Sequence, residues 1–199
     1  KSGSGLHINL SLFFGGHNLF EGFCQAPNEK AAAFLAGVLA HAAECMPFTN
    51  PLPGSYARLG GFEAPGTVSW SPHNRSCLVR VPAATGQDSR IELRSPDPSC
   101  NPYFATLLLL SAGFEGVLAG LALPEAADGD LFAGGGAAPR LPASLGQALG
   151  AARQSEFLRR ALPQKLLDTY LACKQEEFDA YEYSGDRAAY EAAHYFPRI

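Results

Sequence analysis

The stretch Ser89-Arg90-Ile91-Glu92-Leu93-Arg94 decides the fold, because charged and apolar side chains alternate along it. Successive side chains of a β-strand point to opposite faces, so the three charged residues share one face and the two apolar residues share the other. The apolar pair would anchor the strand to a core. The opposite face would carry a carboxylate between two guanidinium groups, and we predict a functional surface there.

A second stretch, Leu6 to Leu12, alternates in the same way. Leucine and isoleucine occupy one face, and His7, Asn9 and Ser11 occupy the other. If this strand lies beside the first, an imidazole, a hydroxyl and a carboxylate meet on one surface with surplus guanidinium groups. Such a surface suits a divalent metal ion and a polyanion. On its own, a strand histidine is more often structural than a ligand.

The composition is that of a globular protein of one domain. The chain has 199 residues, of which 47% are apolar and 17% charged. This balance excludes a disordered tail and allows a sizeable core. The net charge of −4 gives no overall attraction for nucleic acid, so we expect no nucleic-acid partner. Any anion must be bound locally, and arginines do cluster between Arg58 and Arg94.

The cysteines and the N-terminal residues indicate a cytoplasmic protein. Five cysteines without a CxxC pair are typical of reduced thiols, most of them buried. The start, KSGSGLHINL, does not have the pattern of a signal peptide. The longest apolar run, residues 104–110, is too short to cross a bilayer, so we expect no membrane partner. The chain lacks an initiator methionine and enters a strand at once, which indicates a piece of a longer protein.

Strands followed by helices predict an α+β fold, with an antiparallel sheet, helices packed on one face and a helical C-terminal tail. Residues 1–122 would carry the sheet and the functional motifs, residues 123–143 a mobile Gly/Ala-rich linker, and residues 144–199 three or four helices.

Local signals place the other elements. Asn28 would cap a helix over residues 29–45, which Pro47 would end. Residues 67–71 and 77–82 have the spacing of an antiparallel hairpin. Residues 102–121 are apolar all round and predict a buried helix on the back of the sheet. The Pro/Gly-rich stretch 48–65 is long enough to be a functional or mobile loop.

Six motifs occur in the order found in glutamine synthetases: S-G-S-G-L-H-I-N-L-S, N-P-x-x-x-S-Y-A-R-L, G-F-E-A-P, N-R-S, R-I-E-L-R and S-P-D-P-S-C-N-P-Y. The chain resembles the C-terminal part of a bacterial-type glutamine synthetase catalytic domain, over most of residues 2–121 and more loosely through the tail. The resemblance implies a sheet of the glutamine synthetase/guanido kinase type and, for the full-length protein, a homo-oligomer of stacked rings.

The resemblance also implies roles for individual residues. His7 and Glu92 match two ligands of one of the family's two divalent-metal sites, which hold Mg²⁺ or Mn²⁺. The residues that match ATP contacts are Asn9, Ser11, Arg75, Arg80 and Arg90. Those that match glutamate contacts are Ser2, Gly3, Arg58, Glu63 and Arg94. Glu63 and Arg75 are the expected catalytic residues, and Glu63 matches a flap carboxylate that draws a proton from ammonium.

The implied activity is ATP-dependent ligation of ammonia to glutamate through a γ-glutamyl phosphate. Alternatives are another γ-glutamyl ligase, acting on ethanolamine, a polyamine or an aromatic amine, and a non-catalytic structural or binding member. Three departures from the family bear on this. Ser2 stands where the family has Asn, and Asn9 stands where His is frequent. Phe132 falls near the position at which some members carry a tyrosine that is adenylylated, so we do not expect control by adenylylation. The family's other metal carboxylates lie upstream, so we expect the 199 residues alone to be inactive and to bind Mg·ATP poorly.

Overall fold

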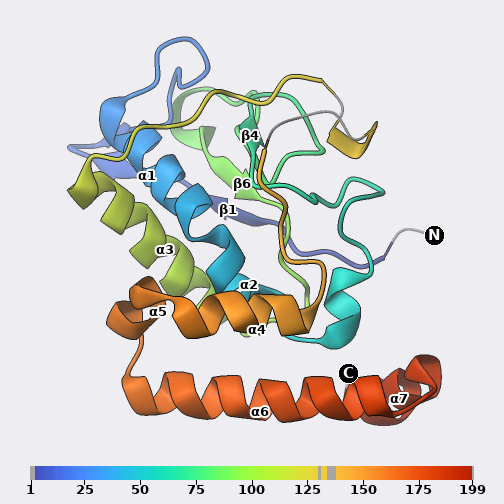
Figure 1. The fold of residues 1–199 in the computed structure, drawn as a ribbon. Coiled ribbons are helices and arrows are strands. Elements are labelled where there is room, and N and C mark those ends of the chain that lie inside the picture. Colours follow the sequence, from blue (N-terminus) through green and yellow to red (C-terminus); the bar gives the residue numbers. More distant parts are fainter. Residues whose placement is uncertain (1–2, 130, 134–137, 199) are drawn as a thin grey trace.

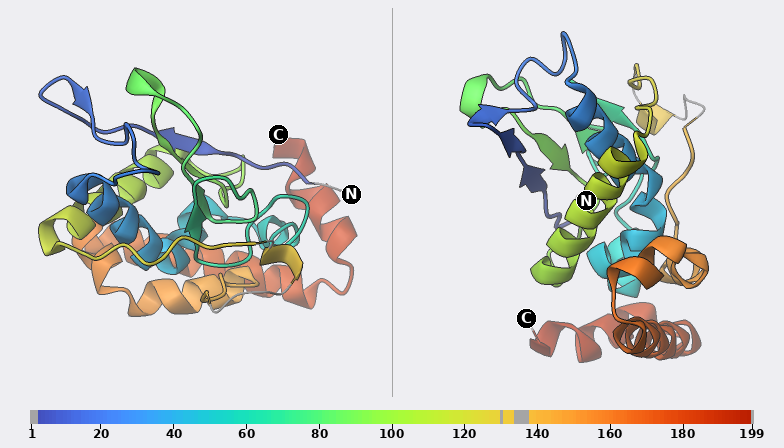
Figure 2. Two further views of the ribbon diagram at one scale, coloured as in Figure 1. Left: turned by 90° about the horizontal axis from the view of Figure 1, so that it is seen from above. Right: turned by 90° about the vertical axis from the view of Figure 1, so that its left-hand side faces the viewer.

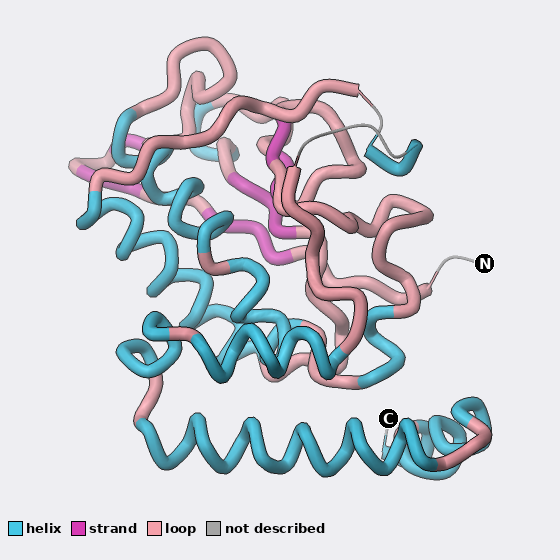
Figure 3. Tube along the Cα trace, viewed as in Figure 1, coloured by secondary structure: helices cyan, strands magenta, loops and turns pink. Residues whose placement is uncertain are grey.

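The computed structural model describes residues 3–129, 131–133 and 138–198. A small sheet, a layer of helices packed against it and a helical tail build the chain (Figure 1). The predicted α+β class is therefore confirmed. Much of the chain around the sheet is loop rather than strand (Figure 3).

The sheet contains β1 (Ile8–Leu10), β6 (Ile91–Leu93), β5 (Val79–Arg80) and β4 (Trp70–Ser71), in that order. β1 and β6 are antiparallel, and Asn9 lies opposite Glu92. β6 and β5 are also antiparallel, and Arg80 lies opposite Glu92 from the other side. The two alternating strands are thus neighbours, as predicted.

The antiparallel hairpin predicted for residues 67–71 and 77–82 is wrong, because β4 and β5 are parallel. Two consecutive turns account for this. The Ser71 hydroxyl accepts a hydrogen bond from the backbone N–H of Asn74 (3.4 Å), and the Asn74 side chain accepts one from the N–H of Ser76 (2.9 Å). Each turn redirects the chain, so β5 leaves the connection in the direction of β4.

A small second sheet follows β1. It pairs β2 (Phe13–Phe14) with β3 (His17–Asn18) across a Gly-rich turn. Gly15 and Gly16 have φ values of 59° and 82°, which glycine adopts without a steric cost. The alternating stretch from Leu6 to Leu12 is strand only over β1, and β2 begins at Phe13.

The predicted helix 29–45 is split in two. α1 (Glu29–Ala40) begins at Asn28, whose side chain accepts from the N–H groups of Lys30 and Ala31, so the predicted cap is confirmed. The chain bends by 68° at His41 before α2 (Ala42–Thr49). Pro47 lies inside α2 and does not end the helix. Its flanking residues, Met46 and Phe48, are buried, and their packing holds the proline in a helical turn.

α3 (Pro102–Ala119) begins at the cap Asn101 and ends at Gly120, which has a left-handed φ of 61°; both ends lie close to the prediction. The helix crosses α1 in close contact, because Gly37 faces the backbone of Ala112 and Gly116. The expected all-round burial is wrong, since Tyr103 and Leu118 are 84% and 88% exposed. By length and composition α3 could span a bilayer, a test that core helices also pass, and 33% of it is buried.

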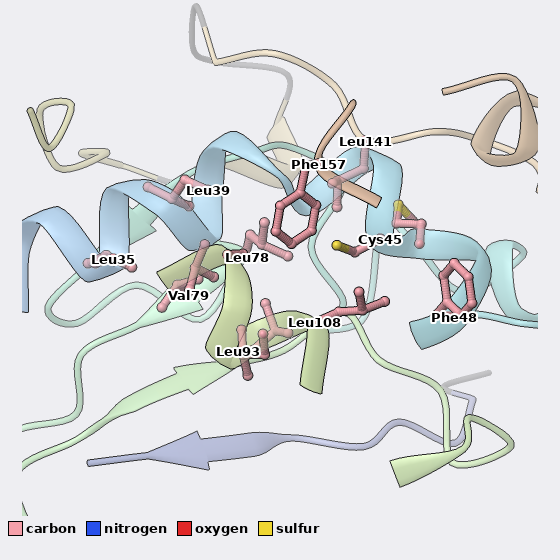
Figure 4. Packing of buried hydrophobic residues seen from close by; sticks show 14 of the residues in the cluster. Leu35, Leu39, Cys45, Phe48, Leu78, Val79, Leu93, Leu108, Leu141 and Phe157 are labelled. Carbon is pink, nitrogen blue, oxygen red and sulfur yellow. The ribbon is translucent and has the colours of Figure 1, made fainter. Parts of the chain in front are cut away.

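The hydrophobic core lies between the sheet, α1, α2 and α3 (Figure 4). Leu35 and Leu39 of α1 approach Val79 and Leu93 of the sheet there, and Leu108 of α3 packs beside them. The tail contributes buried side chains to the same cluster, so it folds as part of the domain.

The tail contains α4 (Leu145–Gln154), α5 (Glu156–Ala161), α6 (Gln164–Tyr183) and α7 (Arg187–His194), in agreement with the prediction of three or four helices. α4 and α5 lie between α6 and the rest of the chain (Figure 2). Tyr170 of α6 stacks on Phe48 at 4.3 Å between ring centroids. Short 3₁₀ helices complete the secondary structure: η1 (Pro53–Tyr56), η2 (Gly86–Asp88), η3 (Leu131–Ala133) and η4 (Phe196–Arg198).

The described parts of the predicted linker run along β4. We call residues 121–129 and 138–142 the strap. The N–H of Ala127 donates to the carbonyl of Trp70 (2.8 Å), and the N–H of Val68 donates to the carbonyl of Pro139 (2.7 Å). The strap is therefore held to the sheet by backbone hydrogen bonds. The Gly134–Gly136 run, on which the predicted mobility rested, lies outside the described residues.

Candidate functional site

A cavity of about 360 Å³ opens between the N-terminal segment, the loop 57–64 and the end of β6. Its walls include residues predicted for three separate roles, namely Gly3, His7, Arg58, Glu63 and Arg94. Segments far apart in the sequence thus converge on one space. Ser2, the other predicted glutamate contact, lies outside the described residues.

His7 and Glu92 meet beside this cavity, as their places on adjacent strands predict. The Nδ1 atom of His7 lies 2.6 Å from Oε1 of Glu92. The His7 side chain is 42% exposed, whereas that of Glu92 is 6% exposed. The imidazole therefore faces the open space, and the carboxylate lies beneath it in the protein.

Glu92 is buried between two arginines. Arg94 Nη1 donates to Oε1 at 2.8 Å, and Arg80 Nε donates to Oε2 at 2.7 Å. Burial alone would raise the pKa of Glu92. The hydrogen bond from Arg80 and the charges of Arg94 and Arg80 outweigh burial, so the pKa lies below its ordinary value. Glu92 is consequently ionised at neutral pH.

His7 is held in its neutral form. Burial lowers its pKa, and the charges of Arg94, Arg80 and Arg58 lower it further, while Glu92 acts in the opposite direction. A neutral imidazole beside an ionised carboxylate is a donor set that divalent metal ions accept. Within the described residues no three His, Cys, Asp or Glu side chains gather as a metal site. The pair therefore fits part of a coordination shell.

The two arginines predicted for glutamate keep unused donors. Arg94 is buried and also donates from Nε to the carbonyl of Arg75 and from Nη2 to that of Glu63, both at 3.2 Å. Arg58 donates from Nη2 to the carbonyl oxygens of Ser95 and Pro96. A guanidinium group has five N–H bonds, so each side chain is fixed in place and still has N–H groups available for a carboxylate.

The loop that carries Glu63 is strained and lines the cavity. Phe62 and Glu63 have φ values of 49° and 66°, a left-handed conformation that is unfavourable for side chains other than glycine. Glu63 Oε1 pairs with Arg75 Nη1 at 3.1 Å, and both side chains are more than half exposed. Exposed pairs of this kind contribute little free energy, so the contact can open at small cost.

The predicted ATP residues occupy the sheet surface beyond Glu92. Arg90 Nε donates to Asn9 Oδ1 at 3.0 Å, so these two side chains form one polar pair across β1 and the start of β6. Ser11 donates its hydroxyl to the carbonyl of Ser89 at 2.8 Å. Arg80 and Arg75 lie on the other side of Glu92. Arg80 contacts Glu92, and Arg75 contacts Glu63.

Two residues of the site were not predicted. Asn50 is buried and donates to the carbonyl of Ser95 at 2.8 Å, the same oxygen that accepts from Arg58. Phe62 lines the cavity and is 73% exposed. Asn50 lies within a quoted motif, but a buried support cannot be recognised from residue type. Phe62 also lies within a quoted motif, G-F-E-A-P, but an exposed aromatic residue in a Gly-rich loop fits many roles.

Comparisons with known proteins identify the family of this chain. The family model described as glutamine synthetase, catalytic domain, matches residues 1–193. Glutamine synthetase of Thermus thermophilus is 40% identical over 193 residues, and that of Methanococcus voltae is 36% identical over 189 residues. Each alignment covers 90% of this chain and 42% of the relative, so the chain spans less than half of their length.

A solved structure described as "GmaS/ADP complex-Conformation 1" superimposes with a TM-score of 0.80 at 31% sequence identity. The match covers 90% of this chain and 43% of that protein. The sequence and the fold thus indicate the same family. The chain belongs to the glutamine synthetase catalytic-domain family.

Proposed function

We propose that these residues form part of the active site of an ATP-dependent glutamate–ammonia ligase, which makes glutamine, ADP and phosphate through a γ-glutamyl phosphate. One observation carries the proposal: His7, Arg58, Glu63 and Arg94 surround a single cavity, with ionised Glu92 beneath it. The curated glutamine synthetases that match over 90% of this chain support the same activity.

His7 and Glu92 would hold Mg²⁺ or Mn²⁺, together with ligands from outside the described residues. When bound, the ion would offset negative charge on the nucleotide phosphates. The chain's own contribution is to keep Glu92 ionised, through Arg80 and Arg94, and to hold the imidazole of His7 against it.

Arg58 and Arg94 would bind the carboxylates of glutamate, with Gly3 and Ser2 beside them. Their planar guanidinium groups can each present two N–H bonds to one carboxylate. Gly3 and Gly5 pack closely on the Arg58 side chain, where a Cβ atom at either position would lie within 3.4 Å of it. The glycines therefore leave space for Arg58 to reach the cavity.

Asn9, Ser11, Arg75, Arg80 and Arg90 would bind ATP along the sheet surface. The solved relative is a complex with ADP, which supports a nucleotide as a ligand of the full-length protein. Guanidinium groups beside the transferred phosphoryl group stabilise the charge that develops on its oxygens. The Arg75 side chain is exposed, and Glu63 is its ion-pair partner among the described residues. Arg75 can therefore turn toward a phosphate.

Glu63 would accept a proton from bound ammonium, which frees ammonia to attack the γ-glutamyl phosphate and release phosphate. The loop around Glu63 would close over the cavity and exclude water, which would otherwise hydrolyse that intermediate. A carboxylate in this position favours ammonium as the acceptor. Another acceptor amine is the second candidate, because part of the amine pocket belongs to residues outside this chain.

The test is phosphate release from ATP by the full-length protein. We expect release only when glutamate and ammonium are both present, and formation of glutamine in equal amount. A better rate with ethanolamine, a polyamine or an aromatic amine would keep the ligase class and change the substrate. No ATP turnover with any amine would identify a non-catalytic member. The 199 residues alone should be inactive, and tight Mg·ATP binding by calorimetry would contradict this.

The remaining assignments are proposals of the same kind. Residues 1–122 would carry the active-site motifs and residues 144–199 the helical tail, with 123–143 as the linker. The full-length protein would be cytoplasmic and assemble into stacked rings. Because Phe132 cannot be adenylylated, we propose that this control is absent.

A further inference from the structure

Asn18 of β3 is a buried amide that joins two segments far apart in the sequence. Its side chain belongs to a residue that is 4% exposed. The Nδ2 atom donates to the carbonyl oxygens of Gln87 at 3.1 Å and Ser89 at 2.7 Å. The Oδ1 atom accepts from the backbone N–H of Phe20 at 3.0 Å. Both N–H bonds and the oxygen of the amide therefore have partners, and the amide fixes the two segments relative to each other.

The end of this bridge at β3 is anchored in the hydrophobic core. Phe20 is 1% exposed, and its ring lies 5.6 Å from that of Phe23 and 6.4 Å from that of Phe34 in α1, measured between centroids. The backbone that binds the Oδ1 atom of Asn18 is thus held by packed aromatic rings. A side chain locked on a rigid element can set the position of a loop that it binds.

The other end of the bridge is the turn that leads into β6. We call residues 84–89, which include η2, the η2 turn; it lies beside the β2–β3 hairpin in both views of Figure 2. Its internal hydrogen bonds are long. The N–H groups of Asp88 and Ser89 donate within the turn at 3.3 Å each, and the Ser89 hydroxyl donates to the carbonyl of Ala84 at 3.2 Å. The shorter bond from Asn18, which comes from outside the turn, therefore contributes much to holding it in place.

The carbonyl oxygens of the η2 turn orient two side chains that we assign to ATP. The Ser89 carbonyl that accepts from Asn18 also accepts from the hydroxyl of Ser11 at 2.8 Å. The next carbonyl, that of Asp88, accepts from Nη1 of Arg90 at 2.9 Å. A displacement of the turn would therefore move the Ser11 hydroxyl and the Arg90 guanidinium together.

We propose that Asn18 is a positioning residue for the nucleotide, because it fixes the η2 turn and thereby Ser11 and Arg90. The inference rests on the proposed function, in which these two side chains bind ATP. Since the Asn18 amide is buried and fully hydrogen-bonded, it has no free group for the nucleotide and acts through its neighbours. A residue that acts in this way changes affinity without touching the ligand.

Asn50 provides the matched comparison on the glutamate side. It is also buried, and its amide donates to the Ser95 carbonyl that accepts from Arg58. The two asparagines therefore support different substrates through the same kind of contact. If Asn18 supported only the fold, its loss would affect both substrates alike.

The test measures Mg·ADP binding to the full-length natural protein by calorimetry, and the KM values for ATP and glutamate in glutamine synthesis. We expect Asn18→Ala to raise the Kd for Mg·ADP and the KM for ATP by about 10-fold, and to leave the KM for glutamate unchanged. Asn50→Ala should leave the Kd for Mg·ADP unchanged. Thermal unfolding of each variant is recorded in parallel.

A second variant guards against misfolding of the first. Asn18→Asp keeps the side-chain volume and the acceptor for the Phe20 N–H, but it turns an oxygen toward the carbonyls of Gln87 and Ser89 in place of the two donors. It should weaken Mg·ADP binding at least as much as Asn18→Ala. If neither variant folds, Asn18 supports the fold as a whole and the inference is overturned.

The remaining outcomes separate this inference from the proposed function. An unchanged Kd for Mg·ADP in a folded Asn18 variant, or an equal rise in the KM for glutamate, would overturn the inference and leave the proposed function intact. If the wild-type protein binds Mg·ADP without making glutamine, a raised Kd in the Asn18 variants would still support the inference while the proposed function fails. A wild-type protein that binds no Mg·ADP would overturn both.

Discussion

Arg94 and Glu92 form a buried ion pair with 2.8 Å between Nη1 and Oε1, and their side chains are 3% and 6% exposed. The pair connects the metal-binding residue we propose to the glutamate-binding residue we propose. Both lie on one strand face, two positions apart, so the backbone of β6 sets their separation.

Replacing Glu92 should destabilise the chain as well as abolish activity. Glu92→Ala leaves Arg94 and Arg80 without their shared carboxylate, and breaking a buried pair costs about 3–5 kcal/mol. Urea unfolding followed by circular dichroism measures this loss. The matched control is Glu182→Ala, which removes a pair with Arg187 whose side chains are 40% and 60% exposed, and should cost about 1 kcal/mol or less. Equal costs for both variants would contradict the burial of Glu92. Normal turnover of full-length Glu92→Ala would remove it from the metal site.

Glu63→Ala should reduce activity while leaving the stability of the fold almost unchanged. Its pair with Arg75 is exposed, so the free energy of unfolding should change by about 0.5 kcal/mol or less. In the full-length enzyme, ATP binding should be unchanged by calorimetry, while glutamine synthesis falls by about 100-fold or more because the proton acceptor is gone. Synthesis at the wild-type rate would argue against the flap role.

Asn50→Ala should weaken glutamate binding from a distance. Asn50 and Arg58 share the carbonyl oxygen of Ser95, and Asn50 fixes that oxygen in position. We expect a raised KM for glutamate in the full-length enzyme, an unchanged KM for ATP, and a stability loss of about 1–3 kcal/mol from the buried partner left unpaired. If the KM values for both substrates rise equally, Asn50 supports the whole fold rather than Arg58.

Gly37→Ala adds one methyl group and should strongly destabilise the folded chain. The new methyl group would meet the Ala112 carbonyl at 2.1 Å, so α1 and α3 must separate, at a cost of about 3 kcal/mol. Gly150→Ala in α4 is the control, because no atom lies within 4 Å of the added group there. It should stabilise the chain by about 0.5–1 kcal/mol through helix propensity. Thermal unfolding distinguishes the two, and a stable Gly37→Ala variant would mean that the helices do not touch.

Cysteine reactivity checks the fold without any substitution. Cys24 and Cys173 are exposed, whereas Cys45, Cys77 and Cys100 are buried. Burial raises the pKa of each of these three thiols, which further suppresses the reactive thiolate. Iodoacetamide should therefore label residues 24 and 173 in the native chain, and the other three only in urea. Rapid native labelling at residue 45 would contradict the packing of α2.

The sequence predicted the proximity of His7 and Glu92 better than it predicted the connections between elements. The alternation in residues 6–12 and 89–94 placed His7 and Glu92 on adjacent strands, because a period of two fixes which side chains share a face. Asn28 marked a helix start through its capping chemistry.

The predictions that were wrong concern features that tertiary contacts determine. The bend at His41 and the accommodation of Pro47 depend on what packs around α2, and local propensity does not contain that information. The parallel pairing of β4 and β5 depends on two side-chain turns in seven residues. The exposure of Tyr103 and Leu118 depends on which face of α3 receives α1, and the uniformly apolar sequence of this helix does not indicate that face.

The strap along β4 has a consequence for solution behaviour. Exposed strand edges recruit other chains and start aggregates. Because the carbonyl of Trp70 and the N–H of Val68 already have partners in the strap, that flank of the sheet offers few free backbone groups to a neighbouring molecule. Deleting residues 124–140 should therefore expose these backbone groups and promote aggregation, even if α1 to α7 still form.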